Sequence, residues 1–134
     1  MIASLVIAVA ASAATPARCA PVELAVAPRS LPTAFNAALV RRTSANFAKA
    51  YAKACGKGLI KGQALPRRLF LLNAPDANVA SIYERDGRMV LEYPFLAGGK
   101  PNVPTADELH EAIYCAVKGA TQAEQEESGR CLPD

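Results

Sequence analysis

The sequence predicts an α+β fold in which a helix, a three-stranded antiparallel meander and a second helix follow one another along the chain. Three observations support it: apolar residues recur at helical spacing over residues 31–55, Asp86-Gly87 separates two strand-like runs, and Thr105 begins a helix-capping motif. Because each helix would present one apolar face, we expect both to cover the same side of the sheet, in a two-layer sandwich with two disulfides.

The first helix is predicted at residues 31–55, with Ser30 as its N-cap. Gly56 and Gly58 follow the last periodic residues, as expected at a helix C-terminus. Before the helix, residues 15–30 are rich in Ala and Pro and predict an extended lead-in that contains a short edge strand. The apolar stripe of the helix consists of Phe35, Leu39, Phe47, Tyr51 and Ala54.

Three runs predict the strands of the meander. Leu69–Leu72 is continuously apolar, which favours a strand buried on both faces. Val79–Arg85 and Arg88–Phe95 flank Asp86-Gly87, a pair typical of a type I′ hairpin turn. Counting from that turn predicts the pairs Arg85 with Arg88, Glu84 with Met89, Tyr83 with Val90, Ile82 with Leu91, Ser81 with Glu92 and Ala80 with Tyr93. The side with Ile82 should meet the core, and the half-polar side with Tyr83 should meet solvent or a partner.

The second helix begins at the capping box Thr105-Ala-Asp-Glu108. Its buried face is predicted from the spacing of Leu109, Ala112, Ile113, Ala116, Val117 and Ala120. The tail after Gly119 is polar and acidic, and apart from Cys131 its composition is typical of a disordered segment.

Met1–Ala14 is uncharged and too short to span a bilayer as a helix, which favours a secretory signal peptide. No basic residue precedes this apolar run, so a buried N-terminal helix is the alternative. The prediction is an exported chain, periplasmic or extracellular, with a signal peptide at 1–14, the lead-in at 15–30, a single domain at 31–134 and no stable membrane span once the leader is removed.

The cysteine pattern supports an oxidising compartment. The chain has four cysteines, no CxxC pair and one histidine, which favours two structural disulfides over a metal site or free thiols. A lead-in running antiparallel along the first helix would place Cys19 beside Cys55, which leaves Cys115 to pair with Cys131 through the folded-back tail. We expect no metal and no cofactor.

Charge is segregated along the chain. No acidic residue lies between Leu24 and Pro75, and from Asp76 onward acidic residues outnumber basic ones. Lys49, Lys53 and Lys57 recur every four residues and predict a basic helix face. Such a face could bind an anionic macromolecule or an envelope protein, or it could pair with the acidic half of the same molecule. Nucleic acid is disfavoured because few aromatic residues lie among the basic ones.

Further candidate binding residues lie on and near the strands: Arg67, Arg68, Tyr83, Arg85 and Arg88. For catalysis the candidates are His110 and, three residues before it on the same helix, Asp107. No phosphate-binding loop, GxSxG elbow or HExxH motif is present.

The sequence thus favours a small exported, disulfide-stabilised binding or accessory module of unknown ligand, inhibitor-like or part of the envelope, rather than an enzyme. The alternatives are a small secreted hydrolase-type enzyme using His110 with nearby carboxylates, and a structural subunit acting through the first helix.

Overall fold

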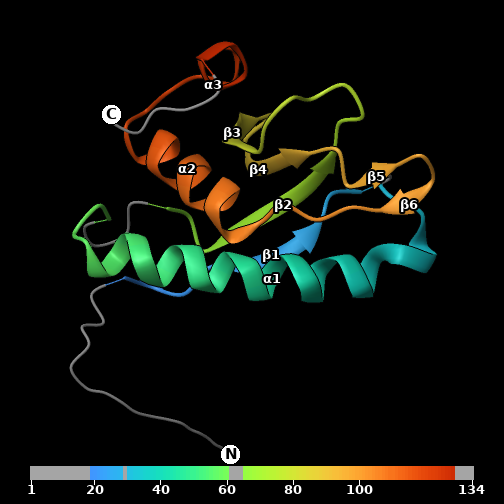
Figure 1. Ribbon diagram of the computed structural model, residues 1–134, viewed down its shortest axis with the longest axis horizontal. Coiled ribbons are helices and arrows are strands. Elements are labelled where there is room, and N and C mark those ends of the chain that lie inside the picture. The colour runs from blue at the N-terminus through green and yellow to red at the C-terminus, as the bar shows by residue number, and fades with distance from the viewer. Residues whose placement is uncertain (1–18, 29, 61–64, 129–134) are drawn as a thin grey trace, which may run out of the picture.

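The computed structural model describes residues 19–28, 30–60 and 65–128, and shows a mixed α+β fold built around a small sheet (Figure 1). Its elements are β1 (Glu23–Val26), α1 (Thr33–Gly56), β2 (Arg68–Asn73), β3 (Ser81–Arg85), β4 (Arg88–Tyr93), β5 (Leu96–Ala97), β6 (Lys100–Pro101), α2 (Ala106–Val117) and α3 (Gln122–Ser128). The lead-in therefore supplies a strand at the sheet edge, as its alternating residues predict.

The main sheet is mixed, with the strand order β1-β2-β4-β3. β1 and β4 both run parallel to β2, whereas β3 pairs with β4 in antiparallel orientation. The predicted antiparallel meander is therefore wrong, because β2 lies beside β4 and not beside β3. The apolar strand β4 occupies the interior position, and the more polar β3 lies at the edge, where unpaired polar groups are tolerated.

The β3–β4 hairpin itself has the predicted register, with Arg85 opposite Arg88 and Ile82 opposite Leu91. Asp86 and Gly87 have φ values of 53° and 81°. Positive φ at both central residues is the signature of a type I′ turn, which an Asp-Gly pair adopts readily. The sequence defined this hairpin but not which of its two strands would meet β2.

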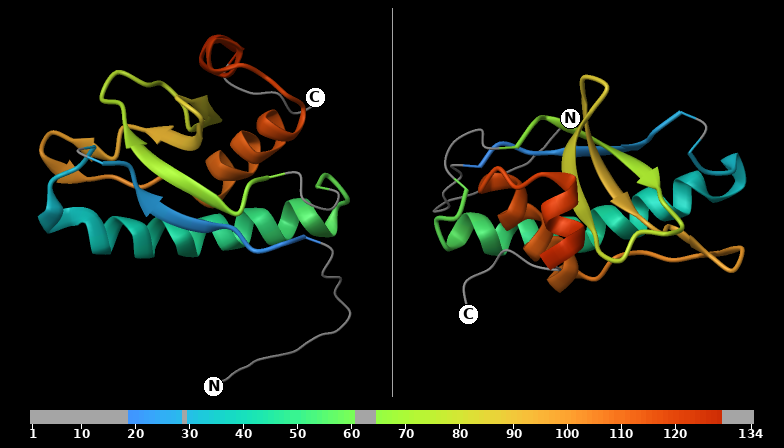
Figure 2. Two further views of the ribbon diagram at one scale, coloured as in Figure 1. Left: turned by 180° about the vertical axis from the view of Figure 1, so that it is seen from behind. Right: turned by 90° about the horizontal axis from the view of Figure 1, so that it is seen from above.

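Both α1 and α2 lie against one face of the sheet, and Figure 2 shows this arrangement from behind and from above. Leu69 and Leu71 of β2 are fully buried beneath them, while Phe70 and Leu72 are half-buried on the opposite face. The prediction that β2 is buried on both faces is therefore wrong. The shared core between sheet and helices includes Leu39, Phe47, Ala54, Ile82, Leu91, Leu109 and Ile113.

The N-terminus of α2 is capped as predicted, whereas that of α1 is not. Thr105 and Glu108 form the expected capping box at the start of α2. Ser30 does not cap α1; its hydroxyl instead accepts a hydrogen bond of 2.6 Å from the backbone N–H of Asn73. Ser30 therefore ties the start of α1 to the end of β2.

The acidic tail forms α3, which covers the free edge of β3. Thr121 and Glu124 exchange the two hydrogen bonds of a second capping box at its start. Gln125 is buried, and its side-chain amide accepts from the Ile82 N–H and donates to the Ile82 carbonyl, both at 3.1 Å. The amide thus pairs with the edge as a neighbouring strand would, which secures a segment whose composition is typical of disorder.

The predicted disulfide between Cys19 and Cys55 is confirmed, with their Cα atoms 6.2 Å apart. It joins the segment before β1 to the last turn of α1. Beside it, the Tyr51 hydroxyl donates a hydrogen bond of 2.6 Å to the Ala20 carbonyl. Cys131, the expected partner of Cys115, lies outside the described residues, as does the predicted leader, so both of those predictions stay predictions.

Replacing Cys19 and Cys55 together with Ser should lower the free energy of unfolding by about 4 kcal/mol, because the bond closes a loop with a sequence separation of 36. Chemical denaturation under non-reducing conditions measures this. An unchanged denaturation midpoint would contradict a stabilising role for the bond.

Replacing Gln125 with Ala should cost about 1–3 kcal/mol, because the edge N–H and C=O of Ile82 lose their buried partner. Faster amide exchange at Ile82 and a lower thermal midpoint are the expected results. The exposed Glu127 of α3 offers a matched control, and Glu127→Ala should change neither measurement.

Candidate functional site

The sheet face opposite α1 and α2, called here the outer face, carries side chains in rows that follow the strand register. Glu23 lies opposite Arg68, and Arg88 lies opposite Arg85. Since Phe70 is level with Val90, a two-residue step along these parallel strands brings Arg68 level with Arg88. The first row across the sheet, called here the arginine row, is therefore Glu23, Arg68, Arg88 and Arg85.

The second row is apolar and lies under the arginines. It consists of Ala25, Phe70, Val90 and Tyr83. The Arg88 guanidinium lies 5.1 Å from the centre of the Phe70 ring, within reach of a cation–π interaction. A depression of about 370 Å³ is bounded here by Ala27, Phe70, Leu72, Arg85, Asp86, Arg88 and Val90. Its floor is apolar, and two arginines outnumber Asp86 among the charged residues that line it, which suits an anionic group attached to an apolar one.

The arginine row is only partly neutralised. The Arg68 guanidinium and the Glu23 carboxylate form an ion pair of 2.7 Å. Arg85 and Arg88 remain exposed and directly opposite each other. Like charges at such cross-strand positions oppose pairing. An anion bound between these two arginines would remove that repulsion.

The third row, formed by Leu72, Glu92 and Ser81, is more enclosed than the sequence predicted. Glu92 is only 7% exposed. The Tyr83 hydroxyl and the Gln122 amide both donate to its carboxylate at 3.1 Å. Burial, and then the Glu92 charge, raise the pKa of Tyr83. The expectation of a half-polar face open to solvent is therefore wrong for this row, because Gln122 at the start of α3 reaches over it.

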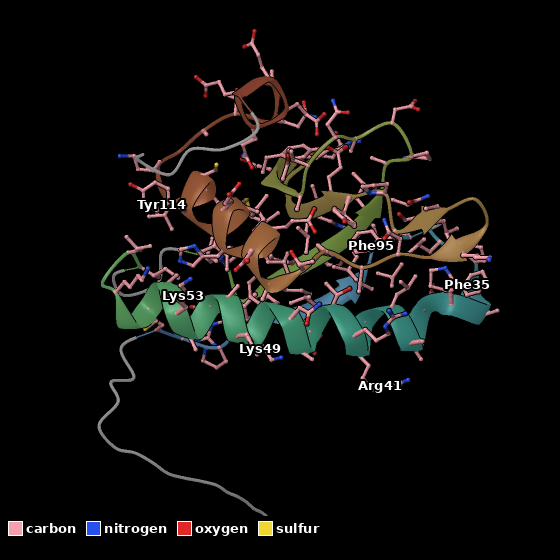
Figure 3. All side chains as sticks on the ribbon, viewed as in Figure 1. Phe35, Arg41, Lys49, Lys53, Phe95 and Tyr114 are labelled. Atoms are coloured by element: carbon pink, nitrogen blue, oxygen red, sulfur yellow. A yellow bond between two sulfur atoms is a disulfide. The ribbon has the colours of Figure 1, made fainter. Side chains whose placement is uncertain are left out.

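The predicted lysine stripe lies on a different side of the molecule from the arginine row. Lys49 and Lys53 of α1 are exposed, as is Lys57, the residue that directly follows the helix. Figure 3 shows Lys49 pointing away from α2, whereas Lys53 projects toward α2. The remaining basic candidate near the strands, Arg67, is exposed just before β2. The structure thus brings Tyr83, Arg68, Arg85 and Arg88 together on one face and leaves the lysines apart.

The catalytic candidate His110 packs inside the molecule. Its side chain is only 6% exposed, and its Nε2 finds no hydrogen-bond partner among the described residues. Burial, and then the charges of Lys53 and Lys57, lower its pKa, while Asp107 and Glu111 act in the opposite direction. No hydrogen bond between His110 and Asp107 occurs within the part of the chain that the structure describes. The geometry therefore gives His110 no substrate-facing position.

A second cavity, called here the apolar groove, lies between α1 and the N-terminal segment, residues 19–24. It has a volume of about 330 Å³, and both disulfide-bonded cysteines line it. The lining residues are Cys19, Pro21, Val22, Leu24, Ser44, Phe47, Ala48, Tyr51, Ala52 and Cys55. Sequence reasoning missed it because Tyr51 and Phe47 fit the periodicity of a fully covered core stripe.

The partial exposure of Phe70 and Leu72 was also not predicted. Four consecutive apolar residues hide the alternation that would have revealed two different faces. The only available signal was the position of Arg68 two residues before Phe70, which places a charge on the same face.

Within residues 19–28, 30–60 and 65–128, no group of three or more His, Cys, Asp or Glu side chains could hold a metal ion. No helix in these ranges has the length and apolar character needed to cross a membrane. Comparisons with models of known protein families, with curated proteins and with solved structures found no match.

Lowering the pH from 8 to 5 should destabilise the protein through His110. Its folded-state pKa lies below the ordinary value of 6.5, so the unfolded chain binds the proton more readily. This contribution to stability is complete above pH 6.5 and is lost as the pH falls toward the folded-state pKa. Denaturation at several pH values measures it, and His110→Leu should flatten the profile. Equal pH dependence in both proteins would contradict this assignment.

Proposed function

We propose that the chain is a small exported, non-enzymatic binding or accessory module that engages an acidic macromolecule of the cell envelope through the outer face. The observation that carries this proposal is the arginine row, since Arg85 and Arg88 lie exposed and opposite each other on the sheet face away from α1 and α2. Export is supported by the uncharged leader and by the disulfide between Cys19 and Cys55.

The geometry favours the outer face over the lysine stripe as the binding surface. Arg88 is held over the Phe70 ring, so less side-chain freedom is lost when it binds an anion. Arginine also offers a planar, bidentate match to carboxylate and phosphate groups. Lys49, Lys53 and Lys57 are exposed, and among the described residues none of the three is held over an aromatic ring. No observation favours the hydrolase alternative, because its histidine is buried.

Reversing Arg85 and Arg88 to Glu should weaken binding to immobilised poly-L-glutamate, a simple acidic polypeptide, by about tenfold or more. The double variant Lys49→Glu with Lys53→Glu changes the net charge equally and should lose less affinity. Biolayer interferometry at two salt concentrations measures both.

Equal losses in the two variants would show unspecific attraction to a basic protein and would contradict a site at the arginine row. A larger loss for the lysine variant would assign binding to α1. Turnover of an ester or peptide substrate that disappears in His110→Ala would support the enzyme instead.

A further inference from the structure

The two edges of the main sheet are treated differently. At the β3 edge, Gln125 occupies the backbone groups of Ile82, and the Glu126 carboxylate accepts from the N–H groups of Asn78 and Val79. At the β1 edge, no described element lies beside the strand. An uncovered edge is a template on which another strand can pair.

The backbone N–H and C=O groups of β1 point alternately toward β2 and away from it. The N–H groups of Glu23 and Ala27 donate to the carbonyls of Arg67 and Leu71, on the β2 side. In a parallel pair the intervening residues direct their N–H and C=O groups to the other side. Leu24 and Val26 therefore present their backbone groups outward, and no described residue pairs with them from that side.

The apolar groove lies directly alongside this edge. Leu24 lines it from β1, and Phe47, Ala48 and Tyr51 line it from α1. A strand added about 4.8 Å from β1 would direct alternate side chains toward the helix side of the sheet. Those side chains would enter the groove. An open strand edge beside an apolar groove against a helix offers both backbone pairing and side-chain pockets.

The surroundings of the groove are basic. α1 contains no Asp or Glu, and Arg41 lies on its groove side, three residues before Ser44 and seven before Ala48. Figure 3 shows Arg41 and Lys49 both pointing from α1 away from α2. The one carboxylate of β1, on Glu23, is paired with Arg68 on the outer face. A partner segment that carries acidic residues would complement this charge.

We propose that the β1 edge and the apolar groove form a docking site for an extended polypeptide segment of a partner protein, in which apolar side chains alternate with acidic ones. The segment pairs with the outward N–H and C=O groups of Leu24 and Val26, and its apolar side chains fill the groove. This site is separate from the arginine row, so it does not depend on the function proposed above.

The test starts from a displayed library of random ten-residue peptides selected on the oxidised full chain. Enriched peptides should alternate apolar and acidic residues, and a synthetic copy should slow amide exchange at Leu24 and Val26. Val26→Pro removes an outward N–H and no bond to β2, so it should fold and weaken peptide binding by about tenfold or more. Ala48→Glu places a carboxylate in the groove and should weaken binding similarly, whereas Ala123→Glu on α3 should not.

The pair Arg85→Glu with Arg88→Glu should leave peptide affinity unchanged, which separates this site from the outer face. Absence of any enriched peptide would overturn the proposal, as would peptides whose affinity is insensitive to both Val26→Pro and Ala48→Glu. A homodimer that Val26→Pro dissociates, without peptide enrichment, would assign the edge to a second copy of this chain and would also overturn it.

Discussion

The attachment of the N-terminal segment to α1 positions β1, which contributes a residue to each of the two candidate surfaces. The bond between Cys19 and Cys55, with the hydrogen bond from Tyr51 to Ala20, fixes the chain just before β1. A four-residue strand at a sheet edge contributes few contacts of its own. Holding its start against α1 reduces the entropy lost when it pairs with β2. β1 then supplies Glu23 to the arginine row and Leu24 to the apolar groove.

The two faces of the main sheet are covered to different extents, and so are its two edges. One face is buried by α1 and α2, while the outer face keeps Phe70 half-buried beneath a guanidinium. One edge is closed by Gln125, a side chain that takes the place of a strand, whereas no strand in the described part of the chain pairs with the outer edge of β1. The closed edge removes one route to aggregation, and the β1 edge and the outer face are the two surfaces that we propose for partners.

Much of the local structure could be predicted from the sequence because it depends on short-range patterns. Asp86-Gly87 determined the hairpin register, Thr105 with Glu108 determined the start of α2, and chain length favoured the pairing of Cys19 with Cys55. The strand order could not be predicted, because either strand of a hairpin can pair with β2. Helix α3 was not predicted, because the polar composition of the tail is typical of disorder. Thr121 and Glu124 nevertheless repeat the capping-box spacing found at α2. For the site, the sequence identified Tyr83, Arg85 and Arg88 but not Phe70, since its exposure depends on which side the helices cover.

The central claim is that the disulfide holds β1 on β2, with the other edge of β1 unpaired among the described residues. Amide hydrogen exchange of residues 23–27, measured by NMR in the oxidised and reduced protein, tests it most directly. The account predicts that Glu23, Ala25 and Ala27 are protected and Leu24 and Val26 exchange fast in the oxidised protein. Reduction should remove the protection of β1 while Leu91 in β4 stays protected. Uniform protection along β1, or protection unchanged by reduction, would contradict the account.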